Sequence, residues 1–205
     1  MAYWNKSCSN TIILLIFVLL QACGSVELDP IPEDGVILAF GDSLTVGVGT
    51  EKAKSYPAVL SVLSGREVMN AGVSGEVTAN GVKRLEAILE NSRVDLLILL
   101  EGGNDILGNK NPAQTKRNLA QMIAQAQRYN IDVVLVGVPE KKIFSSVAPL
   151  YKELAEEYNL VFEAKLIGDL LRQPKYKSDS IHFNEEGYRV MAESLHQLLV
   201  DRGAL

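Results

Sequence analysis

A serine at the end of a short apolar segment is the first candidate for chemistry in this sequence. Ser43 follows Gly41 and Asp42, directly after the apolar residues 36–40. A short apolar segment that ends at a glycine is typical of a buried parallel strand and a tight turn, and ligands bind at the carboxyl ends of such strands. Ser43 is therefore a candidate nucleophile, although a serine that caps a turn would look the same.

A serine hydroxyl also needs a base, and the chain offers two histidines. His196 falls inside a helical pattern near the C-terminus, where an ordinary surface or partly packed histidine is the simpler interpretation. His182 lies in a loop-like segment, three residues after Asp179. That spacing lets the carboxylate hold one imidazole nitrogen while the other accepts a proton. We therefore predict that Ser43, His182 and Asp179 act together.

Two glycine-containing loops offer hydrogen-bond donors for an oxyanion. Gly75 lies in residues 70–78, and a glycine N–H can face a ligand without a side chain in the way. Asn104 follows two glycines after the apolar residues 96–100, and its side-chain amide can donate to a developing negative charge. Taken singly, a turn glycine and an Asn-Asp helix cap explain these loops as well. For Asp42 we predict a structural role, bonded to nearby backbone N–H groups.

These segments, in this order, resemble the SGNH hydrolases, also called the GDSL esterase/lipase family. The matching residues are 41–44, Gly75, 103–105 and 179–182. The resemblance extends over residues 36–202, and within the family it is strongest to the exported thioesterase I, lysophospholipase and arylesterase group. Two departures are Phe183, where a proline often follows the histidine, and the short segment 139–147, which leaves the acyl-chain preference open.

The resemblance implies a serine esterase that cleaves a small acyl ester or thioester through an acyl-enzyme on Ser43. His182 and Asp179 would complete the triad, and the N–H groups of Ser43 and Gly75 with the Asn104 amide would hold the oxyanion. It implies no cofactor and no metal. The alternatives are a carbohydrate O-deacetylase with the same residues and a non-catalytic ligand-binding lipoprotein on the same scaffold.

Composition excludes other classes of function. Two histidines and two cysteines are too few for a histidine-rich or tetrahedral metal site around Asp179 and His182, and no phosphate-binding glycine motif follows the first strand. The net charge is −5 and no lysine- or arginine-rich block occurs, so we expect no nucleic-acid partner.

The N-terminus predicts export. Residues 11–20 are apolar and uncharged, and the Leu-Gln-Ala-Cys of residues 20–23 resembles the lipobox of bacterial lipoproteins. Residues 1–22 are thus a predicted signal peptide, and Cys23 the predicted lipidation site that anchors the protein at the cell envelope, on the periplasmic side of a membrane in a Gram-negative cell. Because Gln21 departs from the usual residue, ordinary cleavage or a free Cys23 stays an alternative. Cys8 lies in the segment that would be removed, so no disulfide is expected.

The remaining chain predicts a tether over residues 23–35 and one catalytic domain over residues 36–205. Short apolar segments alternate with helical patterns, which is typical of an α/β fold whose parallel sheet is covered on both faces. We therefore predict a three-layer α/β/α sandwich with a five-stranded, flavodoxin-like sheet, and we expect a monomer. The predicted strands are residues 36–40, 68–72, 95–100, 132–138 and 160–162. The predicted helices are residues 53–63, 81–90, 112–129, 148–158 and 185–202, the last capped by Asn184.

Overall fold

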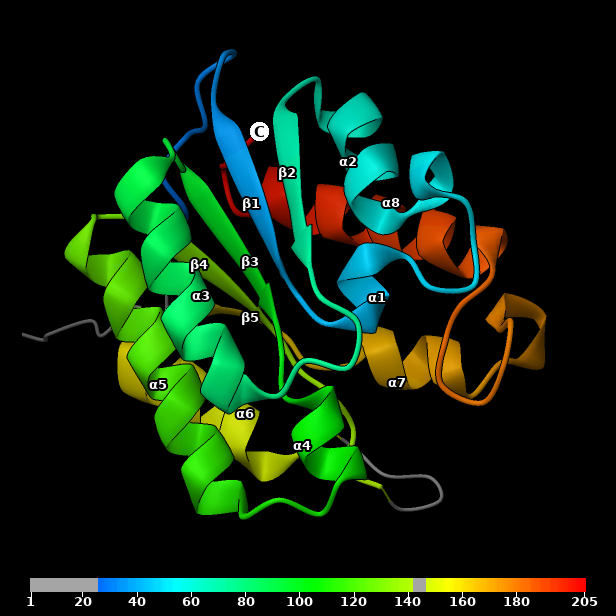
Figure 1. The fold of residues 1–205 in the computed structure, drawn as a ribbon. Helices are drawn as coiled ribbons and strands as arrows, with labels where there is room; N and C mark the ends of the chain where they lie inside the picture. The colour runs from blue at the N-terminus through cyan, green and yellow to red at the C-terminus, as the bar shows by residue number, and fades with distance from the viewer. Residues whose placement is uncertain (1–25, 142–146) are drawn as a thin grey trace, which may run out of the picture.

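The computed structural model describes residues 26–141 and 147–205, and its centre is a parallel sheet (Figure 1). Within these ranges five strands lie in the order β2-β1-β3-β4-β5, and every neighbouring pair is parallel. This is the flavodoxin-like order, as predicted. The strands are β1 (Val36–Gly41), β2 (Glu67–Gly72), β3 (Leu96–Leu100), β4 (Asp132–Val136) and β5 (Val161–Glu163).

Helices connect the strands, and all five predicted helical segments are confirmed with small changes at their ends. They are α2 (Tyr56–Ser64), α3 (Thr78–Asn91), α5 (Pro112–Arg128), α6 (Pro149–Tyr158) and α8 (Glu185–Asp201). Three shorter helices were not predicted, because one or two turns carry no readable apolar period. They are α1 (Ser43–Val46), α4 (Gly103–Leu107) and α7 (Leu166–Leu171), and two short 3₁₀ turns occupy Lys52–Lys54 and Pro174–Tyr176.

The alternating side chains of β1 show why the sheet is covered on both faces. Ile37 and Ala39 belong to one apolar core, which α2, α7 and α8 complete. Leu38 and Phe40 belong to a second core, built with α3, α5 and α6. Since successive residues of a strand point to opposite faces, an uninterrupted apolar strand requires a helical layer on each side. Figure 1 shows these two helical layers, and the three-layer prediction is confirmed.

The segment before β1 is not a free tether over the residues that the structure describes. Leu28 and Ile31 are 7% and 5% exposed and pack into the core beneath α8. The N–H of Leu28 donates to the carbonyl of Arg202 and that of Ile31 to Ala204, both at 2.9 Å. The tether prediction is therefore wrong for residues 26–35. Spaced apolar side chains among the prolines and carboxylates are enough to dock the segment.

The amino end of this segment lies at the edge of the sheet where the strands begin. The N–H of Asp29 donates to the carboxylate of Asp132, the first residue of β4, at 2.7 Å. The predicted signal peptide and Cys23 lie outside the described residues. No helix in the described ranges is long and apolar enough to cross a membrane.

Candidate active site

The predicted site residues meet at the edge of the sheet where the strands end. Ser43 begins α1 immediately after β1, Gly75 follows β2, and Asn104 lies in α4 just after β3. Asp179 and His182 come from the loop that precedes α8. β2 lies on one side of β1, and β3 lies on the other. The strand order therefore changes direction at β1, which opens a crevice at this edge of the sheet.

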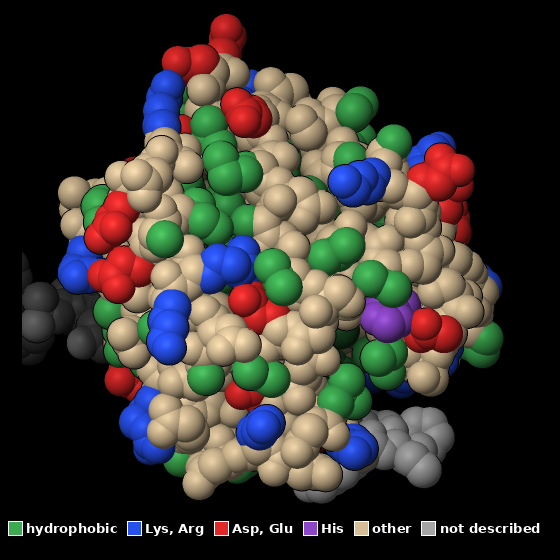
Figure 2. All heavy atoms as spheres, viewed as in Figure 1, with side chains coloured by type: hydrophobic (Ala, Val, Ile, Leu, Met, Phe, Trp, Pro, Cys, Tyr) green, Lys and Arg blue, Asp and Glu red, His purple; other side chains and the backbone are tan. Residues whose placement is uncertain are grey.

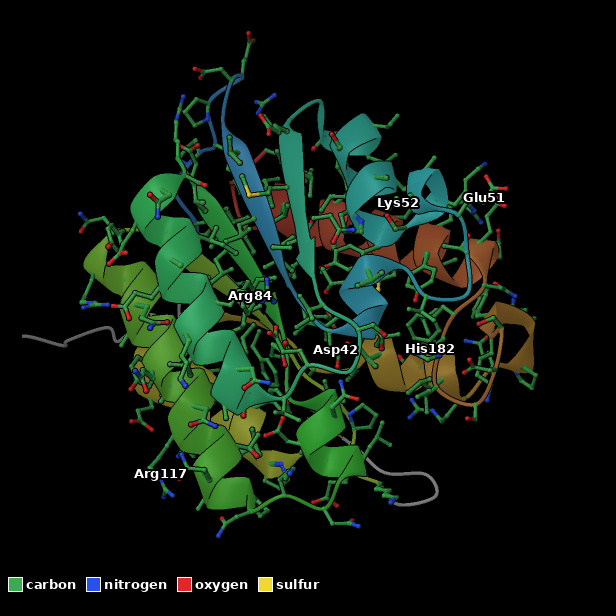
Figure 3. The ribbon with its side chains drawn as sticks, viewed as in Figure 1. Asp42, Glu51, Lys52, Arg84, Arg117 and His182 are labelled. Atoms are coloured by element: carbon green, nitrogen blue, oxygen red, sulfur yellow. The ribbon has the colours of Figure 1, made fainter. Side chains whose placement is uncertain are left out.

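Ser43, His182 and Asp179 form a continuous hydrogen-bonded series. His182 Nε2 lies 3.1 Å from Ser43 Oγ, and His182 Nδ1 lies 2.7 Å from Asp179 Oδ2. Figure 2 shows a histidine beside an acidic side chain at the surface of this face, where Figure 3 labels His182. The second histidine, His196, lies within α8 and is half-buried. The geometry suits transfer of the serine proton to the imidazole.

Local hydrogen bonds hold Asp179 in its ionised form. Its Oδ1 accepts from the backbone N–H groups of Ile181 and His182, each at 2.9 Å. The bond from the Ile181 N–H, together with the His182 ring and N–H, lowers the pKa of Asp179 to about 2. This carboxylate is therefore negative at neutral pH and can stabilise a protonated imidazole.

The turn that carries Ser43 is held by Asp42 and Gly41. Asp42 caps α1 by accepting from the N–H of Leu44 at 3.1 Å, which agrees with its predicted structural role. Gly41 is required by close packing, because a Cβ there would collide with the carbonyl of Leu100 and the hydroxyl of Thr45. Burial raises the pKa of Asp42 to about 6.

The two predicted oxyanion donors, the Gly75 N–H and the Asn104 side-chain amide, differ in how tightly the surrounding residues hold them. Gly75 has a φ of +77°, which favours glycine, and the space where a Cβ would lie is open. Asn104 is more constrained, because its Nδ2 donates to Asp42 Oδ2 at 3.1 Å and to the carbonyl of Glu76 at 2.9 Å. Both amide hydrogens thus have acceptors that fix the plane of the side chain.

An apolar pocket of about 350 Å³ adjoins Ser43. Its lining combines polar residues of the site with aliphatic side chains from the surrounding loops and helices. These aliphatic residues are Leu44, Ile106, Leu107, Val138, Ile167, Leu171 and Ile181. A pocket of this kind suits an aliphatic group attached to a carbonyl.

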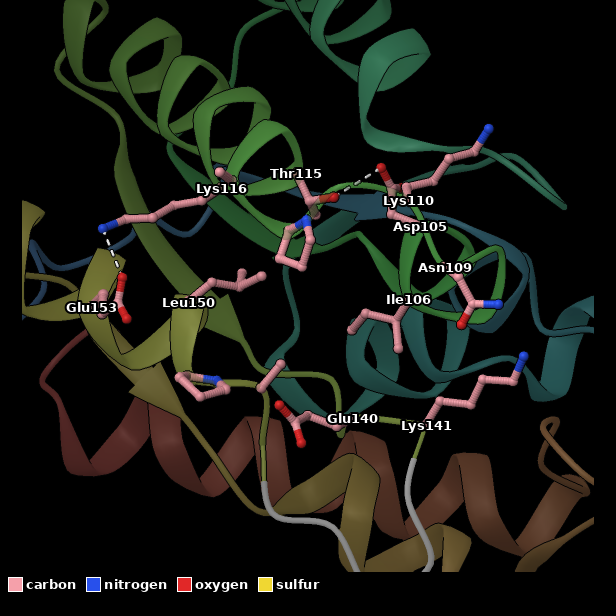
Figure 4. Close-up of a pocket in the computed structure, with 14 residues that line it drawn as sticks. Asp105, Ile106, Asn109, Lys110, Thr115, Lys116, Glu140, Lys141, Leu150 and Glu153 are labelled. Atoms are coloured by element: carbon pink, nitrogen blue, oxygen red, sulfur yellow. Dashed lines mark hydrogen bonds and ion pairs between the residues drawn. The ribbon is translucent and has the colours of Figure 1, made fainter.

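A second and larger pocket, of about 850 Å³, shares Ile106, Glu140 and Lys141 with the first. Figure 4 shows Ile106 and Leu150 extending into it from opposite sides, with Lys116 and Glu153 paired at its edge. Because Ile106, Glu140 and Lys141 line both pockets, the two pockets are neighbours at these side chains.

Buried carboxyl groups behind the site were missed by the sequence analysis. Asp105 accepts from the N–H and hydroxyl of Thr78, at 2.8 and 2.7 Å. Glu101 is 0% exposed, and its Oε1 has no hydrogen-bond partner in the described part of the chain. Burial, with the charge of Asp42, raises the pKa of Glu101 to about 9. A glutamate directly after five apolar residues was the available signal.

Comparisons with known proteins identify the family. The family model described as "GDSL-like Lipase/Acylhydrolase family" matches residues 39–190. This chain belongs to that family. The acylhydrolase is 26% identical over 165 residues to "Thioesterase 1/protease 1/lysophospholipase L1" of Escherichia coli (strain K12), covering 77% of this chain and 79% of the relative. It is 29% identical over 175 residues to "Arylesterase" of Vibrio mimicus, covering 80% and 88%.

Solved structures give the same result. The crystal structure of AlinE4, "a SGNH-hydrolase family esterase", matches with a TM-score of 0.66 and 30% identity, covering 83% of this acylhydrolase and 97% of AlinE4. The crystal structure of TesA matches with a TM-score of 0.71 and 25% identity, covering 80% and 97%. The acylhydrolase is therefore an enzyme that hydrolyses ester bonds, as its sequence predicted.

Proposed function

We propose that this acylhydrolase cleaves carboxylic esters and thioesters of aliphatic acids through an acyl-enzyme on Ser43. The supporting observation is the hydrogen-bonded series from Ser43 through His182 to Asp179 at the mouth of an apolar pocket. Ser43 Oγ attacks the carbonyl carbon while His182 Nε2 takes its proton. His182 then protonates the leaving group and, in the second half, activates the water that releases the acid.

The negative charge on the carbonyl oxygen is received by three donors in this mechanism. They are the backbone N–H groups of Ser43 and Gly75 and the side-chain amide of Asn104. Asn104 already points its two N–H bonds at fixed acceptors. The oxyanion shares the hydrogen directed at Asp42, while the bond to the Glu76 carbonyl keeps the plane of the amide in place.

The lining of the pocket beside Ser43 favours an acyl chain over an acetylated sugar. Its side chains are mostly aliphatic, and a second pocket lies on the other side of Ile106, which lines both. A medium or long chain would bury more apolar surface than an acetyl group, and each buried methylene contributes about 0.8 kcal/mol. Ile106→Trp should therefore reduce activity on long-chain esters more than on acetates.

A panel of substrates tests this proposal. Aryl acetate, a long-chain acyl ester, a long-chain acyl thioester and an acetylated glycan are assayed with the wild type, Ser43→Ala and the control Ser194→Ala, which alters a half-buried serine of α8. We expect Ser43→Ala alone to lose activity, and long-chain substrates to be preferred. Preference for the glycan would favour the deacetylase, whereas equal activity of Ser43→Ala and wild type would refute the mechanism.

We also propose that the mature protein is exported and anchored through lipid on Cys23. Only Gly24 and Ser25 separate that cysteine from Val26, which packs against the core. The docked segment lies where the strands begin, opposite the edge that carries Ser43. The five residues of β4 alone span about 16 Å. The anchor would thus hold the active site away from the membrane surface.

Two measurements test the anchoring. Mass spectrometry of the mature N-terminus should find a diacylated Cys23, and an unmodified cysteine would contradict the proposal. With the lipidated protein in vesicles, a fluorescent phosphonate on Ser43 should escape a quencher attached to the lipid headgroups. Strong quenching would contradict the proposed orientation.

A further inference from the structure

A half-buried arginine connects the loops that carry the proposed oxyanion donors. Arg84 of α3 donates through Nε to both carboxylate oxygens of Glu76, at 3.0 and 3.1 Å, and its terminal nitrogen Nη2 pairs with the same carboxylate. The Glu76 side chain is 4% exposed and the Arg84 side chain 24%. Figure 3 labels Arg84 and, near the end of β1, Asp42. This pair is absent from the proton-transfer steps described above.

The remaining contacts of Arg84 go to the ends of two strands. Nη1 donates to the carbonyl of Ala71 in β2 at 2.8 Å, and Nη2 contacts the carbonyl of Gly41 in β1 at 3.4 Å. The guanidinium carbon lies 3.9 Å from the centre of the Phe40 ring. Five donors in a fixed planar fork suit this task, because one side chain can reach several acceptors at once.

Two partners of Arg84 lie close in the chain to an oxyanion donor. Gly41 lies two residues before Ser43, and Glu76 directly follows Gly75. The carbonyl of Glu76 also accepts from the Asn104 amide at 2.9 Å. All three donors thus depend on backbone that the Arg84–Glu76 pair fixes.

We propose that Arg84 and Glu76 are positioning residues that hold the N–H groups of Ser43 and Gly75 and the Asn104 amide at one common point, the oxyanion of the tetrahedral intermediate. The proposal rests on the oxyanion roles proposed above. Donors preorganised around an oxyanion supply a large part of catalysis, and displacement of a reacting group by about 1 Å can cost about a hundredfold.

The charge of Arg84 has a second consequence. Asp42, Glu76, Glu101 and Asp105 are all buried. Besides burial, the charges of Glu76 and Asp105 raise the pKa of Asp42, the residue beside Ser43, so an unpaired negative charge there would oppose the developing oxyanion. Arg84 offsets the charge of Glu76 without touching the substrate. Arg84 would therefore favour formation of the oxyanion in two ways, by fixing the backbone of its donors and by offsetting the charge of Glu76.

The test compares Arg84→Met and Arg84→Lys with the matched control Arg128→Met. Arg128 of α5 is also paired with a glutamate of α3, Glu86, at 2.9 Å, but both side chains are exposed. The readouts are kcat and KM on an aryl acetate, the affinity for a boronic acid, which binds a serine Oγ as a tetrahedral anion, and the thermal unfolding midpoint.

We expect Arg84→Met to lower kcat about a hundredfold with KM nearly unchanged, and to weaken boronic acid binding by a similar factor. Arg84→Lys should recover little, because an ammonium group does not reproduce the planar fork. Arg128→Met should retain wild-type kcat and boronic acid affinity. A purely structural role would lower the unfolding midpoint and leave kcat and boronic acid affinity of the folded fraction unchanged.

Three outcomes would overturn the proposal: wild-type kcat in either folded Arg84 variant, unchanged boronic acid affinity, or complete rescue by lysine. If Arg84→Met does not fold, Arg84→Lys still decides, because it leaves the positive charge in place. Ser43→Ala separates the two hypotheses. Activity without Ser43 refutes the acyl-enzyme mechanism, whereas loss with Ser43→Ala and normal catalysis in the Arg84 variants refutes only the positioning role.

Discussion

The two sides of the active site are built in different ways. The acid–base side is an exposed loop in which the side chain of Asp179 is 51% exposed and bonded to Ile181 and His182, two and three residues away. The oxyanion side is buried, and its bonds join residues far apart in the chain. Asn104 reaches Asp42 across 62 positions, and Arg84 reaches Gly41 across 43.

The two sides differ because proton transfer and oxyanion stabilisation have different structural requirements. Proton transfer needs one ring and one carboxylate in a fixed relation, which a short loop provides with its own N–H groups. Stabilisation of an oxyanion needs donors from several strands to converge, and only packed strand ends can fix them relative to one another. We therefore expect changes on the acid–base side to affect activity without affecting stability, and changes on the oxyanion side to affect both.

The largest effect is expected from Asp179→Asn. The amide still accepts from the Ile181 N–H but favours the wrong imidazole tautomer, so kcat should fall about 10⁴-fold. The unfolding midpoint should change little, because the side chain is half exposed. Steady-state kinetics and thermal unfolding of the same preparation measure both. A large loss of stability would contradict the comparison.

Asn104→Ala should give the next largest effect. It removes one proposed oxyanion donor, which should lower kcat by about 10²- to 10³-fold with little change in KM. It also leaves the carbonyl of Glu76 and the buried carboxylate of Asp42 without this partner, so the unfolding midpoint should fall as well. An unchanged kcat would remove Asn104 from the oxyanion hole.

The pH dependence of stability in Glu101→Gln tests the buried oxyanion side. Glutamate ionises near 4.3 in the unfolded chain, whereas the pKa of the folded residue is about 9. Between these values the folded state holds a proton that the unfolded state has lost, so this residue makes stability fall as pH rises. Glu101→Gln should therefore gain in unfolding midpoint relative to wild type from pH 5 to 8.5.

Two results would contradict this prediction. One is a difference between the midpoints of Glu101→Gln and wild type that stays constant with pH. The other is an equal trend in the control Glu90→Gln, which alters an exposed residue at the end of α3.

The smallest effect is expected from Asn184→Ala, at the start of α8 and outside both the proton-transfer series and the oxyanion donors. Asn184 caps α8 by accepting from the Gly187 N–H at 3.0 Å, and its amide donates to the carbonyl of Lys175 at 2.8 Å. Its loss should cost about 1 kcal/mol in the free energy of unfolding, measured by denaturant titration. Asn184→Ser should retain most of this free energy of unfolding, because serine also caps helices. If both variants lose the same free energy of unfolding, the cap does not contribute to it.

The amino-acid sequence determined the acid–base side and the sheet. The Asp179–His182 spacing is a local pattern, and the apolar segments of β1 and β3 require cover on both faces, whatever their neighbours. The capping role of Asn184 is equally local, since the N–H group that donates to it lies three residues ahead. Such features depend on residues close in the chain, so they can be read along it.

The tertiary structure decided the oxyanion side and the docking of residues 26–35. Neither the pairing of Arg84 with Glu76 nor the complete burial of Glu101 follows from local spacing, because both depend on which strand ends become neighbours and on how completely water is excluded there. Burial of Leu28 and Ile31 likewise required the surface that α8 provides. Long-range packing sets these contacts, and a carboxylate acquires an altered pKa only after the chain has closed around it.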